Sequence, residues 1–353
     1  MNTLIKLLAV LLITPMIFYS CSPKIIQSNV QKVYYPEIED SAKIQFLATF
    51  NSSTDIEAKQ SAFNKSIIGE VDQVKIKKPY GVDYFEGKIF VCDLGIGGIV
   101  EIDLKSNKFN QIVPRGPGKL DVPLNISIDE LGTIYIVDIS LQKILVYDKD
   151  FNFISSFGKG ELKSPTDIAI INNKIWVTDI VSHTVKVFDK KTNELLFSFP
   201  DTVEGNEDWL YKPSNISASK KYIYVTDVGD GGIKKFSIKG DFISKVGSFG
   251  KAYGQFVRPK GNAVDKEDNL YVVDGSFQNV QMFNDKNQLL MYFGGPTNTS
   301  GGMYLPTGIS ISYDTELFKK YVDLDKFDLK YLIFQINQFG NHKVNVYGRV
   351  EHK

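Results

Sequence analysis

A short unit that starts with a proline and continues through three or four apolar runs recurs six times in this chain. The six prolines are spaced 42–48 residues apart and are Pro79, Pro123, Pro165, Pro213, Pro259 and Pro306. Within 258–294 the apolar runs are Gly261–Val264, Leu270–Asp274, Val280–Phe283 and Leu289–Phe293, separated by turn-forming residues. Such a unit predicts a four-stranded sheet that cannot bury both of its faces alone, and its period is typical of a β-propeller blade. We therefore predict an all-β, six-bladed β-propeller.

The sixth unit lacks a fourth strand, and a segment far upstream could supply it. Its third apolar run, Val344–Tyr347, is followed by only six residues. The lone apolar segment Ile44–Phe50 precedes the first unit. Pairing the two would close the ring and leave no exposed sheet edge. We therefore place the propeller at residues 43–350, with its last blade completed by an N-terminal strand.

An insertion, 314–330, distinguishes the sixth unit from the others. Its apolar residues Leu317, Tyr321, Leu324 and Phe327 are three or four positions apart. This spacing predicts a short amphipathic helix.

The N-terminus has the pattern of a targeting segment. Lys6 is followed by an apolar run, 7–19, that is too short to span a bilayer comfortably. The Ser20-Cys21 pair that follows resembles the lipobox of bacterial lipoproteins, although Phe18 stands where leucine is usual. An uncleaved anchor or an ordinary secretory signal is the alternative interpretation.

The lipoprotein interpretation makes 1–20 a signal peptide and predicts diacylation of Cys21, which would anchor the chain to a membrane. Residues 21–42 are polar and would form a tether. Ser22 fits sorting to the outer membrane of the cell envelope, by analogy with other lipoproteins. The sequence leaves open whether the domain faces the periplasm or the outside.

Charge and cysteine content narrow the functions further. The chain has 41 basic and 41 acidic residues, so it lacks the basic field that nucleic-acid binding requires. We expect no nucleic-acid partner and a monomer. The second cysteine, Cys92, lies in a predicted core strand, where a buried apolar role is more typical than a reactive thiol.

The repeated unit Pro-x-Gly-Ile, Ile-Tyr-Val-x-Asp, Val-x-Val-Phe-Asp, Phe-x-x-x-Phe-Gly resembles the NHL repeat. Pro259–Gly294 and Pro165–Phe199 match it best, and Asn341-His342 resembles the Asn-His pair that names the repeat. The resemblance covers about 300 residues and is to NHL-repeat lipoproteins of bacterial envelopes. It implies a six-bladed propeller that is usually used for binding, although lyases and lactonases are among similar propellers.

Strand alternation places the loops between blades and the turns between second and third strands on one face, which we call the top face. The longest inter-blade loop, 200–212, contains Trp209 and Tyr211 among four acidic residues. Aromatic side chains in such loops are candidate binding hot spots. The alternative is that Trp209 fills the junction between blades three and four. The other candidates for this surface are Arg115, Tyr253, Phe256, Arg258, Phe277 and Tyr304.

An acidic residue ends the second strand of each of the first five units. These residues are Asp93, Asp138, Asp179, Asp227 and Asp274. A carboxylate in this position can accept hydrogen bonds from the backbone of the following turn, which is the structural interpretation. The functional alternative is a ring of carboxylates that binds Ca²⁺ near the channel. We expect no cofactor otherwise.

Catalytic and metal-binding patterns are weak. His183 and His342 occupy similar places in opposite blades and His352 lies at the tail, so we expect no metal site built from them. We assign no catalytic residue, because the sequence contains no G-x-S-x-G, P-loop or H-E-x-x-H motif.

The sequence therefore predicts a non-catalytic, lipid-anchored envelope propeller that recognises a protein, peptide or glycan on its top face. A metal-dependent enzyme of the lactonase or lyase type is the first alternative. A purely structural envelope component is the second.

Overall fold

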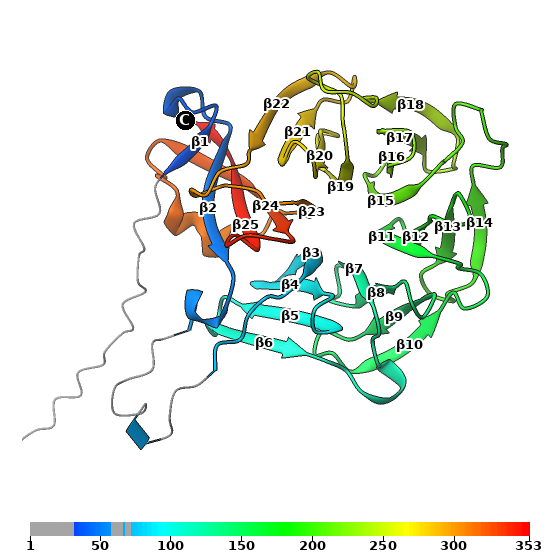
Figure 1. The fold of residues 1–353 in the computed structure, drawn as a ribbon, viewed down its shortest axis with the longest axis horizontal. Coiled ribbons are helices and arrows are strands. Elements are labelled where there is room, and N and C mark those ends of the chain that lie inside the picture. The colour runs from blue at the N-terminus through cyan, green and yellow to red at the C-terminus, as the bar shows by residue number, and fades with distance from the viewer. Residues whose placement is uncertain (1–31, 58–65, 68–71) are drawn as a thin grey trace, which may run out of the picture.

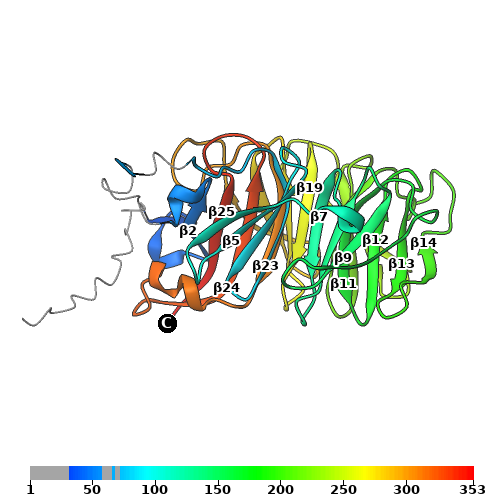
Figure 2. The same cartoon turned by 90° about the horizontal axis from the view of Figure 1, so that it is seen from below.

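The computed structural model describes residues 32–57, 66–67 and 72–353, and it is a six-bladed β-propeller. Six antiparallel sheets are arranged around a central axis, as Figure 1 shows, and the strands run between the two faces of the disc in Figure 2. The predicted fold class is confirmed. The predicted signal peptide, Cys21 and the first half of the predicted tether lie outside the described residues.

Blades one to five are four-stranded, and each follows the chain from the axis outward. Blade one comprises β3 (Pro79–Phe85), β4 (Lys88–Asp93), β5 (Gly98–Asp103) and β6 (Lys108–Ile112). Blade two comprises β7 (Pro123–Ile128), β8 (Ile134–Asp138), β9 (Lys143–Tyr147) and β10 (Phe153–Phe157). Blade three comprises β11 (Pro165–Ile171), β12 (Lys174–Asp179), β13 (Thr184–Asp189) and β14 (Leu195–Phe199).

Blade four comprises β15 (Pro213–Ala218), β16 (Tyr222–Asp227), β17 (Gly232–Ser237) and β18 (Phe242–Val246). Blade five comprises β19 (Pro259–Val264), β20 (Leu270–Asp274), β21 (Asn279–Phe283) and β22 (Leu289–Gly294). Short 3-10 helices η1 (Glu39–Ser41), η2 (Ser53–Asp55) and η3 (Gly116–Gly118) lie in the connections. The six prolines each begin an innermost strand, where a missing backbone N–H is tolerated.

Blade six combines both ends of the described chain in one five-stranded sheet, in the order β1-β2-β25-β24-β23. Strand β2 (Ile44–Phe50) pairs with β25 (Val344–His352), so that Phe46 is opposite Tyr347 and Phe50 is opposite Val344. Strands β23 (Pro306–Ser312) and β24 (Phe327–Asn337) complete the sheet. The predicted closure of the ring by the N-terminal strand is confirmed.

The described domain begins earlier than the predicted boundary at residue 43. Strand β1 (Val33–Tyr35) pairs with β2 inside the segment we expected to be a tether. Its aromatic residues provide the reason, because Tyr34 packs on Phe327 and Tyr35 packs on Phe293. The strand thereby covers residues 44–46 of what would otherwise be the open edge of β2.

The insertion in blade six is mostly not the predicted amphipathic helix. Only Glu316–Tyr321 is helical, as the 3-10 helix η4, and β24 already begins at Phe327. The side chain of Phe327 is fully buried in the sheet and packs against His352. Leu317 and Tyr321 therefore pack from the 3-10 helix and Phe327 from the strand, whereas Leu324 lies between the two elements and is 42% exposed.

The core lies between neighbouring blades, because each sheet has two apolar faces. One cluster, for example, joins Val137 and Ile144 of blade two to Ile175 and Val177 of blade three, and all four are fully buried. Burial of a side chain of this size contributes about 1.5–3 kcal/mol, which explains why second and third strands are apolar on both faces. Across the described part of the chain, no helix is both long and apolar enough to pass through a bilayer.

Candidate functional site: a groove on the top face

The five second-strand acids organise the top face. All five side chains are fully buried, and each lies opposite the proline that begins its own blade. In blade two, Asp138 accepts hydrogen bonds from the amides of Asp121 (2.7 Å), Val122 (3.1 Å) and Leu141 (3.0 Å). The same arrangement recurs at Asp93, Asp179, Asp227 and Asp274.

These hydrogen bonds extend the structural interpretation of the five acids. As expected, each carboxylate accepts an amide of the turn that follows, but it also accepts amides of the loop that precedes the blade. Each acid therefore ties an inter-blade loop to its own blade. In blade six the equivalent residue is Asn337, which accepts the amide of Tyr304 at 3.0 Å.

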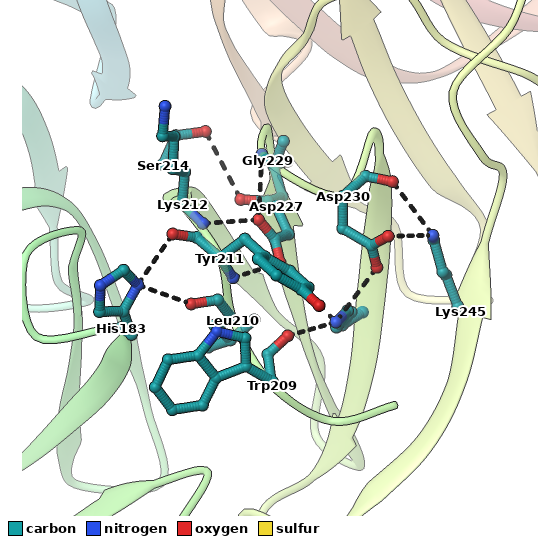
Figure 3. Close-up of polar contacts among 12 residues, drawn as sticks. His183, Trp209, Leu210, Tyr211, Lys212, Ser214, Asp227, Gly229, Asp230 and Lys245 are labelled. Carbon is teal, nitrogen blue, oxygen red and sulfur yellow. Dashed lines mark hydrogen bonds and ion pairs between the residues drawn. The ribbon is translucent and has the colours of Figure 1, made fainter. Parts of the chain in front are cut away.

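Asp227 holds the end of the longest loop in position. This fixes the part of the loop that carries Trp209 and Tyr211. The carboxylate of Asp227 accepts the amides of Tyr211 (2.8 Å) and Lys212 (2.7 Å). The indole of Trp209, which is partly exposed, stacks on the imidazole of His183, with ring centroids 5.1 Å apart and planes 24° apart (Figure 3). His183 Nδ1 lies 2.8 Å from the carbonyl oxygen of Tyr211. One face of Trp209 is therefore covered by blade three.

The residue that fills the junction between blades three and four is the neighbour of Trp209. Leu210 is fully buried and packs with Val185 of blade three and Ile223 of blade four. The loop is thus anchored by Leu210 and Asp227, which leaves Trp209 and Tyr211 partly exposed beside each other.

A buried cation supports the same loop from below. Lys234, on β17, is 1% exposed and donates to the carbonyl oxygen of Trp209. Its Nζ lies 3.1 Å from Asp230 Oδ2 and 5.6 Å from the centre of the Tyr211 ring. Lys245, on β18, forms a 2.7 Å ion pair with the other oxygen of Asp230 (Figure 3). Burial raises the pKa of Asp230, but the hydrogen bonds and charges of the two lysines outweigh it and hold that pKa below its usual value.

These residues border a groove of about 490 Å³ along the outermost strand of blade four. One side consists of loop residues 205–207 and Tyr211, and the other of residues 242–245 of β18. Asp230 and Lys234 also line the groove. It therefore combines aromatic surface, charges of both signs and the free edge of a strand, which are the features of a peptide-binding groove.

The remaining predicted surface residues do not gather at this groove. Phe256 is a correction, because its side chain is fully buried between blades four and five and packs on Phe283. Tyr253 is 79% exposed and stacks on Tyr292 at the rim of blade five. The others are exposed or partly exposed in loops and turns of other blades, and they are Arg115, Arg258, Phe277 and Tyr304.

Two channel carboxyls, Asp83 and Asp167, were missed by the sequence analysis. They lie on the innermost strands β3 and β11 and line a cavity of about 280 Å³. Burial raises the pKa of Asp167 to about 7, against opposing hydrogen bonds, and Asp83 adds to the effect. Burial likewise raises the pKa of Asp83. The available signal was an acid within an innermost strand, a place where most blades have apolar or small residues.

Cys92 lies in the core, and His342 lies in a turn of the top face. Cys92 is fully buried, and burial raises the pKa of its thiol, which disfavours the reactive thiolate. His342 Nε2 lies 3.4 Å from the carbonyl oxygen of Asn298 in a top-face turn. Among residues 32–57, 66–67 and 72–353, no three His, Cys, Asp or Glu side chains form a group that could hold a metal ion.

Comparison with known proteins supports the fold and leaves the function open. No protein-family model matches the chain. It is 28% identical over 187 residues to a probable peptidyl-alpha-hydroxyglycine alpha-amidating lyase, pgal-1, of Caenorhabditis elegans. The match covers 51% of this chain and 50% of that protein, so this chain matches about half the length of its curated relative.

Solved structures resemble the fold of the chain at low sequence identity. A protein of unknown function from Bacteroides thetaiotaomicron is 14% identical with a TM-score of 0.58, covering 88% of this chain and 76% of that one. An auxiliary nutrient binding protein from Bacteroides ovatus is 12% identical with a TM-score of 0.57, covering 78% and 70%. Virginiamycin B lyase from Staphylococcus aureus is 16% identical with a TM-score of 0.53, covering 77% and 95%. Identities this low show a shared fold alone.

Proposed function

We propose that this protein is a lipid-anchored binding propeller of the bacterial cell envelope that captures an extended peptide segment in the groove beside β18. The observation that carries the proposal is the partly exposed Tyr211, which lines the groove beside an open strand edge, with the partly exposed Trp209 next to it in the loop. Strand β18 is the outermost strand of its sheet, so its outer edge is free for pairing. An added peptide strand would gain backbone hydrogen bonds from β18 and side-chain contacts from the aromatic pair.

Preorganisation supports this assignment. The loop is fixed without a ligand by contacts with four side chains, which are Asp227, Leu210, His183 and Lys234. Binding would therefore cost little ordering of the aromatic side chains, which raises affinity for a given contact area. Aromatic anchors held in this way are typical of hot spots.

The experiment is a binding screen of the purified chain against random peptides and against a glycan array. We expect extended peptides to bind, and Trp209→Ala and Tyr211→Ala to weaken binding at least 10-fold each. Phe339→Ala is the matched control, because Phe339 is a 58% exposed aromatic residue in the blade-six turn. N-methylation of alternate peptide residues should abolish binding if backbone pairing with β18 is used. Glycan binding without peptide binding, or equal effects of all three substitutions, would overturn the proposal.

Membrane attachment is the second part of the proposed function and is tested separately. The support is the apolar run followed by Ser20-Cys21 at the N-terminus. Metabolic labelling with a fatty acid should modify the wild-type chain but not Cys21→Ser, and fractionation should place the labelled protein in the outer membrane. Labelling that persists in Cys21→Ser would contradict the assignment.

A lyase is the second candidate function, and the sequence similarity to the amidating lyase favours it. A carboxyl with a pKa of about 7, such as Asp167, is suited to proton transfer. The test is incubation of the purified chain with a peptidyl-α-hydroxyglycine and detection of the amidated peptide by mass spectrometry. Turnover that is lost in Asp167→Asn would favour the lyase over the binding protein.

A further inference from the structure

The six blades begin in the same way on the top face. In each blade, the carbonyl oxygen of the residue before the opening proline accepts an amide of the turn between the second and third strands, at 2.9–3.2 Å. Because these residues directly precede the innermost strands, which surround the axis in Figure 1, they form a ring at the top mouth of the channel. The six residues are Lys78, Val122, Ser164, Lys212, Arg258 and Leu305.

The charged residues of this ring are all positive. Lys78, Lys212 and Arg258 are exposed cations, and none of the six positions holds an acid. A fourth cation, Lys260, follows Arg258 by two positions, and alternate residues of an extended segment lie on the same side. Since the chain has equal numbers of basic and acidic residues, the ring is a local excess of positive charge.

Arg258 and Lys260 lie near each other without a counter-ion from the protein. Among the ion pairs of the described residues, none includes either side chain. Burial lowers the pKa of Lys260, and the charge of Arg258 lowers it further. Two like charges held together are unfavourable, so an anion between them would be stabilised.

Close packing of three innermost strands brings a residue of blade one to the same place. Gly261 of β19 has no room for a Cβ atom, which would overlap the carbonyl oxygen of Thr307, and Gly308 of β23 has none beside the carbonyl oxygen of Tyr80. Thr307 Oγ1 also donates to that oxygen of Tyr80 at 3.1 Å. Lys260, Thr307 and Tyr80 are the second residues of β19, β23 and β3, so they lie at one level of the channel.

Tyr80 adds a hydrogen-bond donor to the two cations. Burial, followed by the charge of Asp167, raises the pKa of Tyr80 to about 12, while the charge of Arg258 lowers it. Arg258 of blade five therefore acts on a side chain of blade one, which agrees with a guanidinium group directed over the mouth of the channel. The hydroxyl of Tyr80 stays protonated at neutral pH and can donate to an anion.

We propose that the top mouth of the channel binds a small multivalent oxyanion, a polycarboxylate or a polyphosphate, through Arg258, Lys260 and the hydroxyl of Tyr80. The planar guanidinium group matches two oxygens of a carboxylate or phosphate, and the ammonium group adds a compact charge. Lys78 and Lys212 of the same ring favour a multivalent anion over a monovalent one, because their attraction acts on every charge of the ligand.

This site is separate from the groove beside β18. None of Arg258, Lys260 and Tyr80 lines that groove, whose charged residues are Glu207, Asp230 and two lysines that pair with Asp230. The two sites can therefore be tested independently on the same protein.

The experiment is isothermal titration of the full chain in detergent with tripolyphosphate, with citrate and with acetate at constant ionic strength. We expect at least one multivalent anion to bind roughly 100-fold more tightly than acetate, and the anion that binds identifies the group recognised. Arg258→Gln and Lys260→Gln should each weaken its binding about 10-fold, and Tyr80→Phe about 3-fold. Lys251→Gln is the matched control, because Lys251 is an exposed cation of the loop that leads to Arg258.

Three results would overturn the proposal. They are no binding of either multivalent anion, binding no tighter than that of acetate, and an effect of Arg258→Gln no larger than that of Lys251→Gln. The comparison of the three anions uses only the wild-type chain, so it tests the proposal even if a variant fails to fold. Trp209→Ala should leave anion binding unchanged, so failure of the groove proposal and failure of this one are separable.

Discussion

At the scale of single residues, the buried turn acids connect stability to the geometry of the top face. The fully buried carboxylate of Asp138 accepts hydrogen bonds from three backbone amides. Without it, these amides would have no hydrogen-bond acceptor. Because the acids recur in each of five blades, the loops that carry candidate binding residues are fixed by a common device. Binding specificity can then vary through loop sequence without loss of the fold.

Replacement of one such acid should be costly. Asp138→Ala leaves the amides of Asp121, Val122 and Leu141 without their acceptor, so we expect a loss of roughly 3 kcal/mol in the free energy of unfolding. Urea denaturation followed by circular dichroism measures it. The exposed Asp325→Ala should change stability by less than about 0.5 kcal/mol. A similar small effect at Asp138 would show that the hydrogen bonds are not needed.

Asp167 makes stability depend on pH. Its pKa is raised by burial to about 7 in the folded chain, whereas an unfolded aspartate titrates near 3.9. Between these values the folded protein keeps a proton that the unfolded chain has lost, so stability falls as pH rises from about 4 to 7 and levels off above. Asp83, whose pKa is also raised, contributes in the same direction.

We expect the Asp167 contribution to be on the order of 2 kcal/mol, because the residue is only partly buried beside the channel cavity, and partial exposure weakens the effect of burial. Asp167→Asn should flatten the fall in stability, and denaturation at pH 5 and pH 7.5 measures the difference. If the change in the free energy of unfolding between pH 5 and pH 7.5 were the same in the wild-type chain and in Asp167→Asn, this account would be contradicted.

At the scale of elements, we expect strand β2, although it has only seven residues, to contribute strongly to the stability of the fold. Phe46 is nearly fully buried and meets the ring of Tyr347 edge-on at 5.6 Å, so it joins the N-terminal strand to the C-terminal one. Phe46→Ala should lower the free energy of unfolding by about 3–4 kcal/mol. Phe339→Ala, at an exposed aromatic residue, should have little effect, and thermal unfolding of the two variants compares them. Equal shifts in the two variants would argue that closure by β2 is not important.

The strands were predicted well from the sequence because burial and the positions of the turns mark the same segments. Leu270–Asp274 and Ile44–Phe50 are buried on both faces and also bounded by turn formers, so apolar run and strand coincide. The insertion in blade six was predicted less well, because Leu317 packs from a 3-10 helix while Phe327 packs from a strand. A spacing of three or four residues cannot distinguish these cases.

The candidate site was predicted only in part for the same kind of reason. Trp209 and Tyr211 stood out as aromatics in the longest loop, and the structure places Tyr211 in the lining of a groove and Trp209 against His183. Phe256 was misassigned because a loop position does not reveal which way a side chain points. Asp83 and Asp167 were overlooked because the polarity of an innermost strand matters only once six such strands meet at an axis.

At the scale of the whole molecule, we expect closure of the ring to prevent self-association of the chain. Sheet edges in blades one to five are the outermost strands, but the interior of blade six depends on β2 to cover β25. Removal of β1 and β2 would leave the nine-residue strand Val344–His352 with an unpaired edge. An edge of this length is a template for pairing with another chain.

A chain that begins at residue 52 should therefore self-associate, whereas one that begins at residue 32 should remain a monomer. Size-exclusion chromatography with light scattering measures the mass of both. Hydrogen exchange adds a second readout, because amides of β25 should lose protection in the shorter chain while those of β12 and β13 in blade three retain it, since each sheet is hydrogen-bonded internally. A monomeric shorter chain with β25 still protected would mean that three strands of blade six are sufficient. Loss of protection in every blade at once would instead show that the ring is stable only when closed, with the blades unfolding as one cooperative unit.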